Sequence, residues 1–202
     1  MRILKFLTGL ALLGITEFSF AQSSFHRRTL QVGAGVSTLN SDGGWSSPQP
    51  DYFFGLGFSR GGQALGFGLD LNLAWRRFIE PADVLGMFDS SSMSVRMIRF
   101  EIPFYLRFKI TQSSSFKLGA FYSKSLGDLG RNFGGSGFSY SDSSYASENW
   151  LTSDYGLILG WMWHFNKFNI DLRYTWGAKD IYEDHPGTQY SRFIDLVFSY
   201  GF

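Results

Sequence analysis

The stretch RMIRFEIPFYLRFKI, residues 96–110, alternates between apolar and mostly polar side chains with a period of two. From Ile98 onward every even position is apolar, and most odd positions carry a charged or polar group. Successive side chains of a β-strand point to opposite faces, whereas no helix separates these two sets cleanly. The stretch therefore predicts a long strand with one apolar face. Pro103 is the exception, since proline removes one donor from a β-ladder.

The same alternation recurs in seven further segments. They cover residues 30–37, 52–59, 66–76, 116–123, 155–165, 168–177 and 193–202. Short links and long links between these segments follow one another in turn along the chain. Short turns at one end and long loops at the other are typical of a membrane barrel. The sequence predicts an all-β fold, an eight-stranded antiparallel up-and-down transmembrane β-barrel, with both termini on the periplasmic, short-turn side.

The composition indicates which face meets lipid. Charged residues make up 17% of the chain, below the roughly 25% of an ordinary soluble domain, and aromatic residues make up 19%. Eleven of the 24 glycines fall on the polar face, as expected for a narrow interior that alternates small and long side chains. Aromatic residues gather at both ends of the apolar face, matching the two bilayer interfaces. These features favour lipid outside over a soluble, lipocalin-like barrel.

The first 21 residues are expected to be a signal peptide that precedes a barrel domain over residues 22–202. Its marks are a positive start, a short apolar run and small residues at the cleavage site: Arg2 and Lys5, Leu7–Ile15, and Ser19 with Ala21. The run is shorter than the roughly 20 residues of a membrane helix. Glu17 is the one residue that fits poorly.

Charge and cysteine content exclude several classes of protein. A formal net charge of +1 argues against nucleic-acid binding through a basic patch. The absence of Cys excludes disulfides and thiolate zinc sites. We expect no cofactor and no metal site.

Charged side chains on the polar face would meet inside the barrel. Eight strands leave a lumen just wide enough for side chains to fill, and an unpaired buried charge costs several kcal/mol. We therefore expect a structural ion-pair network, with a gated ion path as the alternative. The predicted network is Asp70, Arg76, Arg99, Glu101, Arg107, Asp171, Arg173 and Asp195, with Lys109 and Lys117 on the same face.

No catalytic residue is predicted. A nucleophile–base–acid set needs a hydroxyl near a histidine, and no His-x-Ser grouping like that of lipid A deacylases occurs. His26 and His164 are assigned to the periplasmic side. His185 with Asp184 and a loop serine is the enzymatic alternative left open.

The predicted long loops are acidic and contain one aromatic-rich segment. Acidic loops would attract divalent cations that bridge to lipopolysaccharide, and Arg76 and Arg77 could contact lipid phosphate at the outer rim. Outer-membrane lipid and lipopolysaccharide are therefore expected partners. A candidate partner-binding loop carries Phe138, Tyr140 and Tyr145 among serines and glycines, a composition typical of binding loops. It could form a protruding hairpin with a free edge, or stay flexible.

The signal segment, the eight amphipathic strands and the ending FSYGF, residues 198–202, resemble small outer-membrane β-barrel families. The terminal aromatic is similar to the signal read by the barrel-assembly machinery. The hairpin Tyr155–Trp176 resembles the PorT-like outer-membrane barrels of Bacteroidetes. That resemblance implies an outer-membrane location and no catalytic site, and some members serve a secretion apparatus tied to gliding motility.

We therefore expect a non-enzymatic outer-membrane barrel that is structural or binds a partner through long extracellular loops. It would be a possible accessory of a secretion apparatus. The alternatives are a small-solute channel and an outer-membrane lipid-modifying enzyme.

Overall fold

In a computed structural model the chain forms a closed β-barrel. The structure describes residues 27–41, 44–61, 64–81, 92–135, 138–141, 153–180 and 188–202. The eight long strands are β1 (Arg27–Ser41), β3 (Gln49–Gly61), β4 (Leu65–Pro81), β5 (Ser92–Lys109), β6 (Ser114–Gly135), β8 (Ser153–Phe165), β9 (Phe168–Asp180) and β10 (Gln189–Gly201). Two short strands, β2 (Gly44–Trp45) and β7 (Phe138–Ser141), pair with β1 and β6. Within the described ranges no helix has the length and hydropathy of a membrane span.

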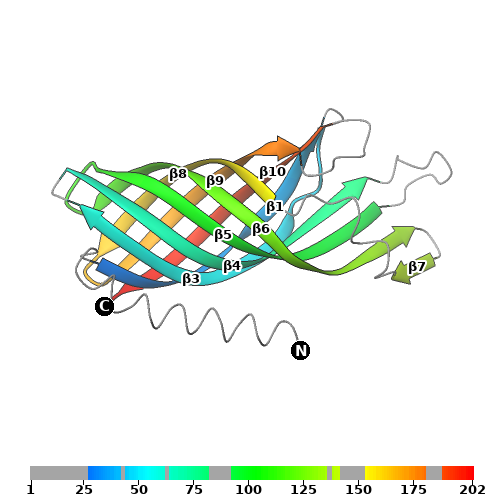
Figure 1. Cartoon of the computed structure of the whole chain (residues 1–202), viewed down its shortest axis with the longest axis horizontal. Coiled ribbons are helices and arrows are strands. Elements are labelled where there is room, and N and C mark those ends of the chain that lie inside the picture. The colour runs from blue at the N-terminus through cyan, green and yellow to red at the C-terminus, as the bar shows by residue number, and fades with distance from the viewer. Residues whose placement is uncertain are drawn as a thin grey trace.

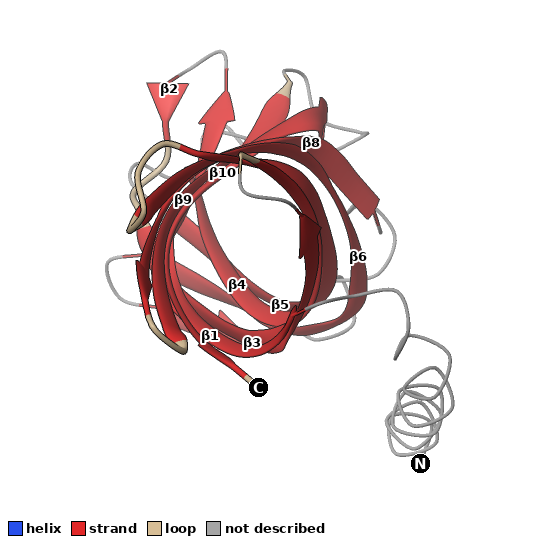
Figure 2. Cartoon of the chain, turned by 90° about the vertical axis from the view of Figure 1, so that its left-hand side faces the viewer, coloured by secondary structure: helices blue, strands red, loops and turns tan. Residues whose placement is uncertain are grey.

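The long strands pair with their neighbours in chain order, and every pair is antiparallel. The last strand, β10, then pairs with β1 from Thr29↔Gly201 to Ser41↔Gln189, which closes the sheet into a ring. Figure 2 looks along this ring, and Figure 1 shows it from the side. The predicted eight-stranded up-and-down barrel is thus confirmed.

The two faces of the barrel differ as the alternation predicts. Large apolar side chains stand on the outside, and Leu30, Phe54 and Phe198 each leave about half of their surface exposed. Inward-facing residues such as Asp70 and Arg173 are buried. A continuous apolar exterior around a polar interior suits a barrel whose solvent is lipid.

One end of the barrel carries the short turns and both ends of the described chain, and we call it the turn end. Figure 1 shows it on the left. The tightest connection there is the two-residue turn Asn166–Lys167 between β8 and β9, in which Asn166 has a φ of 53°. Two-residue hairpin turns need this left-handed backbone, and asparagine tolerates it. The opposite end is the loop end.

At the loop end β4, β5 and β6 run further than the other strands. β5 and β6 stay paired up to Ser92↔Gly134, whereas β8 pairs with β6 only as far as Lys124. Figure 1 shows this three-stranded piece reaching past the end of β8. We call it the extension: it comprises Arg77–Pro81, Ser92–Arg96 and Ser125–Gly135.

The predicted end of the fifth strand, residue 123, is wrong, because this strand is β6 and continues to Gly135. Met97 pairs with Asp128 while Arg96 pairs with Gly130, and Ile98 pairs with Gly127 while Arg99 pairs with Ser125. Each shift leaves one extra residue in β6, first Leu126 and then Leu129. Such bulges break the period of two, so the sequence pattern is lost where the strand continues.

Pro103 interrupts the ladder between β4 and β5. The pairing of β4 with β5 lapses between Leu69↔Phe104 and Asn72↔Glu101, and the register resumes unchanged. The missing N–H of proline explains this gap.

The Asn166 turn yields a stability prediction. Asn166→Val should lower the free energy of unfolding by about 1 kcal/mol or more, because a β-branched residue is strained at positive φ. Asn166→Gly should leave it nearly unchanged. Urea unfolding in detergent measures both, and equal midpoints for the two variants would contradict the assignment.

Candidate functional site: the charged lumen and its two ends

Arg76 of β4 is the central ion-pairing residue of the lumen. Its Nε and Nη2 donate to the two carboxylate oxygens of Glu101 at 2.9 and 2.8 Å. Its Nη1 lies 2.8 Å from Asp195 Oδ1 and 2.9 Å from Asp51 Oδ2. The guanidinium is 2% exposed and stacks over the ring of Phe193, with its Cζ 4.2 Å from the ring centroid. One cation is therefore held by three carboxylates from three other strands.

A second cluster lies nearer the turn end. Arg173 Nη2 donates to Asp70 Oδ2 at 2.9 Å and to Asp171 Oδ2 at 3.1 Å. Lys117 Nζ binds the same Asp171 oxygen at 2.7 Å and lies 4.1 Å from the ring centroid of Tyr105. The Tyr105 hydroxyl donates to Asp70 Oδ1. Four strands are thus joined through one hydrogen-bonded group.

A third cluster lies toward the loop end. Arg99 donates to the Ser123 hydroxyl and lies 3.5 Å from Asp154 Oδ2, which also accepts from Ser191. A buried apolar group on the same inner face accompanies it: Leu39, Phe78, Val95, Met97, Phe121, Ile158 and Phe193. Charged pairs and apolar side chains together fill this part of the interior.

Of the eight side chains predicted for the network, the structure brings seven into these ion-paired clusters. Arg107 instead lies at the mouth of the turn end, where it forms no ion pair with a described carboxylate. Lys109, expected inside, is exposed beside the turn. Arg76, also considered for lipid phosphate, is buried in the lumen, so that second interpretation is wrong.

Sequence reasoning missed two carboxylates, Asp51 and Asp154, which are both buried in the lumen. Each stands one residue before the start of a predicted strand. Extending the alternation by one position would have placed both on the inner face. In each case the Asp directly follows a polar, loop-like stretch, which hides the start of the strand.

The lumen charges are unequally distributed along the barrel axis. In the loop half, Arg76 and Arg99 face four carboxylates, which are Asp51, Glu101, Asp154 and Asp195. In the turn half, Lys117 and Arg173 face Asp70 and Asp171, and the mouth adds Arg27 and Arg107. Among the described residues the formal charge is therefore two negative toward the loop end and two positive toward the turn end.

A polar chain spans part of the mouth at the turn end. His164 Nε2 lies 2.7 Å from Ser115 Oγ, and its Nδ1 lies 2.9 Å from Asn169 Oδ1. Asn169 Nδ2 in turn donates to Ser199 Oγ at 3.2 Å. A hydroxyl, an imidazole and an amide in this order resemble a nucleophile–base–orienter set. Ser115 is only 1% exposed, however, so a substrate could not reach its oxygen.

The outer surface near the loop end carries cations. Arg77 and Arg96 are directly opposite one another on β4 and β5, and Lys124 is exposed on β6. Like charges in directly opposed positions on neighbouring strands are unfavourable. Nearby, Arg192 lies between Trp176 and Tyr190 and donates to the carbonyl oxygens of Gly177 and Ser191.

The remaining predicted residues fall partly outside the described structure. Phe138 and Tyr140 belong to β7 and pair with Gly135 and Phe133 of β6. Tyr145, His26 and His185 lie outside the described residues. In the described part of the chain no three His, Asp or Glu side chains are arranged to hold a metal ion.

The closed barrel, with lipid-compatible residues outside and paired charges inside, defines an integral outer-membrane β-barrel protein. The chain belongs to the outer membrane protein beta-barrel domain family, whose model matches residues 20–183. A comparison with curated proteins finds no match.

Solved structures of other barrels are similar to this chain. Neisserial surface protein A (NspA) matches with a TM-score of 0.51 and 15% identity, over 87% of this chain and 97% of NspA. The attachment invasion locus protein Ail of Yersinia pestis matches with a TM-score of 0.49 and 16% identity, over 87% of this chain and 98% of Ail. Ail is also matched as its complex with the heparin analogue sucrose octasulfate, with a TM-score of 0.48 and 16% identity over the same shares of the chains. At 15% identity the likeness to NspA shows the fold alone.

The contacts of Arg76 yield a stability prediction. Arg76→Met leaves Asp51, Glu101 and Asp195 without their shared cation, and losing one partner of a buried ion pair costs about 3–5 kcal/mol. We expect a loss of that size in urea unfolding. Adding Glu101→Gln and Asp195→Asn should restore much of it.

The matched control is Arg60→Met, since Arg60 is exposed at the turn end. It should shift the unfolding free energy by no more than about 0.5 kcal/mol. Equal losses from the Arg60 and Arg76 variants would show that the central cluster contributes nothing particular to stability.

Proposed function

We propose that this outer-membrane barrel is non-enzymatic and binds a protein partner at its loop end, through the extension. The observation that carries the proposal is an edge of β6 that no described strand covers. From Ser125 to Arg131, β6 has no strand partner on the side away from β5 among the described residues. An unpaired edge offers backbone donors and acceptors to an added strand. The short strand β7 covers only the tip, Asn132–Gly135.

The filled lumen supports binding over transport. Ten charged side chains lie buried inside, and apolar side chains accompany them toward the loop end. Opening a path would separate ion pairs in a medium of low dielectric, which costs several kcal/mol for each ion. We infer that the network is a structural plug and that the barrel is no small-solute channel.

The enzymatic alternative has little support in the described residues. Ser115, His164 and Asn169 are connected, but the serine is buried and belongs to the wall of the barrel. Its hydrogen bond to His164 instead ties β6 to β8 at the turn end. We assign the hydrogen-bonded set of Ser115, His164 and Asn169 a structural role.

The cellular setting completes the proposal. Residues 1–21 act as a signal peptide, the termini face the periplasm, and the barrel-assembly machinery inserts the chain by its terminal aromatic strand. The likeness of Tyr155–Trp176 to PorT-like barrels supports a role as an accessory of a secretion apparatus. The partner would then be a component of that apparatus.

The outward cations support contact with anionic lipid at the same end. Arg77 and Arg96 stand side by side across two strands, at the level where the extension leaves the barrel. A phosphate group between them would remove their repulsion and accept charge-assisted hydrogen bonds from both. We propose that lipopolysaccharide phosphate occupies this position.

Shortening the connection between β6 and β8 tests the partner proposal. Joining Leu126 to Ser153 through a short Gly-Ser linker removes the free edge and should abolish photo-cross-linking to the partner from position 125. Replacing residues 82–91 with a short Gly-Ser linker is the matched control, because it shortens the connection between β4 and β5 and leaves the β6 edge intact. Cross-links that survive the first deletion, or vanish equally with the second, would refute the role of the edge.

The lipid proposal predicts a separate defect. Arg77→Gln with Arg96→Gln should weaken binding of lipid A micelles to the purified barrel by about tenfold, as expected for losing two charge-assisted contacts. Arg60→Gln with Lys109→Gln removes the same charge at the turn end and should leave binding intact. Equal weakening by both pairs would indicate unspecific charge attraction.

A further inference from the structure

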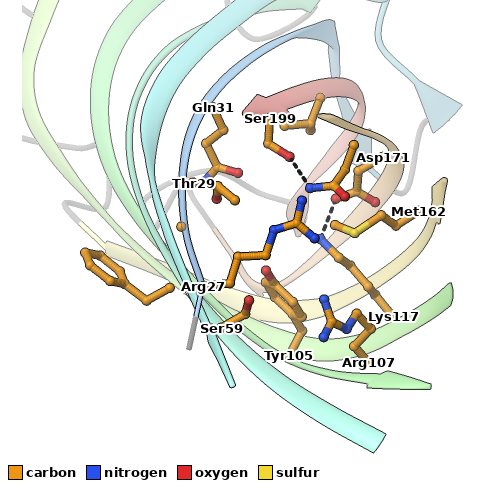
Figure 3. Close-up of a pocket in the computed structure, with 14 residues that line it drawn as sticks. Arg27, Thr29, Gln31, Ser59, Tyr105, Arg107, Lys117, Met162, Asp171 and Ser199 are labelled. Carbon is orange, nitrogen blue, oxygen red and sulfur yellow. Dashed lines mark hydrogen bonds and ion pairs between the residues drawn. The ribbon is translucent and has the colours of Figure 1, made fainter. Parts of the chain in front are cut away.

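The mouth of the lumen at the turn end holds a small hollow that is partly open to the exterior. Figure 3 shows its lining, with Arg27 reaching toward the centre and Arg107, Lys117 and Tyr105 below it. Hydroxyl and amide groups complete the wall: Thr29, Ser59, Ser199 and Asn169. The hollow does not overlap the extension, so its role is independent of the proposed partner.

Two guanidinium groups face this hollow without an ion-pair partner among the described residues. Arg27 donates from Nη2 to the backbone oxygens of Asn166 and Lys167, at 3.2 and 3.4 Å, and forms no ion pair with a described carboxylate. Arg107 forms none either, and the two guanidiniums repel each other. The one carboxylate in the lining, Asp171, is already held by Lys117 and Arg173. The wall of the hollow is therefore positive.

Two glycines leave the space that both arginine side chains occupy. A Cβ added at Gly201 would lie 2.7 Å from Nε of Arg27, and one at Gly66 would lie 3.1 Å from Nη2 of Arg107. Each guanidinium thus occupies space on the inner wall that a side chain at the glycine would take. Placing two like charges side by side is unfavourable, and the two glycines leave the room that this arrangement needs.

We propose that this hollow binds the phosphoryl group of an anionic ligand. Arginine pairs match the oxygens of phosphate through several parallel hydrogen bonds, and the surrounding hydroxyls and amide can donate to the remaining oxygens. The bound anion neutralises the surplus positive charge of the turn half of the lumen. The phosphoryl group can come from a free phosphorylated solute or from a lipid headgroup folded over the rim.

Calorimetric titration of the full-length barrel in a neutral detergent tests the site. Inorganic phosphate and a short-chain phosphatidic acid are the two probes. Arg27→Gln or Arg107→Gln should weaken phosphoryl binding by about tenfold or more, the loss expected for a charged hydrogen-bonding partner. Arg60→Gln is the matched control at the same end, outside the lining, and should stay within about twofold of the parent chain.

Gly201→Ala is the decisive variant, because it displaces Arg27 while leaving the net charge unchanged. It should weaken binding as Arg27→Gln does, and circular dichroism checks that the barrel remains folded. Saturable binding of either probe, lost in these variants, supports the site; stronger binding of inorganic phosphate points to a solute, and stronger binding of phosphatidic acid points to a headgroup. Absence of saturable binding of both probes, or equal weakening by Arg60→Gln, overturns the proposal.

Discussion

In a bilayer no water is present to satisfy a backbone N–H or C=O group, and the rest of this structure depends on that constraint. Strands satisfy it only when the sheet has no edge, so β10 must pair with β1. Closure with eight strands then fixes a narrow interior. The narrow interior decides which side chains fit, and it explains why glycines alternate there with Arg, Lys and Asp.

Cations in different parts of the lumen are neutralised to different degrees. Arg76 is surrounded by three carboxylates, whereas Arg27 and Arg107 share a hollow with none of their own. The same residue types, placed differently along the barrel axis, would have neutralised the charge in each half of the lumen. The surplus of one sign at each end is therefore a property of the arrangement.

The sequence was enough to predict the fold, because the period of two is a local property that each strand such as 96–110 displays by itself. It failed where local order is interrupted: the bulges at Leu126 and Leu129 hide the rest of β6, and Asp51 and Asp154 stand just outside the recognised pattern. Contacts between strands could not be predicted from the sequence for another reason. Ser115 and His164 are 49 residues apart, and only the register of β6 with β8 brings them together.

The seam between β1 and β10 also determines when the barrel can be completed. Its residue pairs join positions at opposite ends of the described chain, so loop-closure entropy favours forming this ladder last. Contacts of such long sequence separation are slow, because chain entropy must be lost before they are gained. Until that moment β1 and β10 each present an unpaired edge, one on either side of a nearly complete sheet. The nascent barrel is thus most vulnerable to aggregation immediately before its final step, and any factor that assists assembly would act by guarding those two edges.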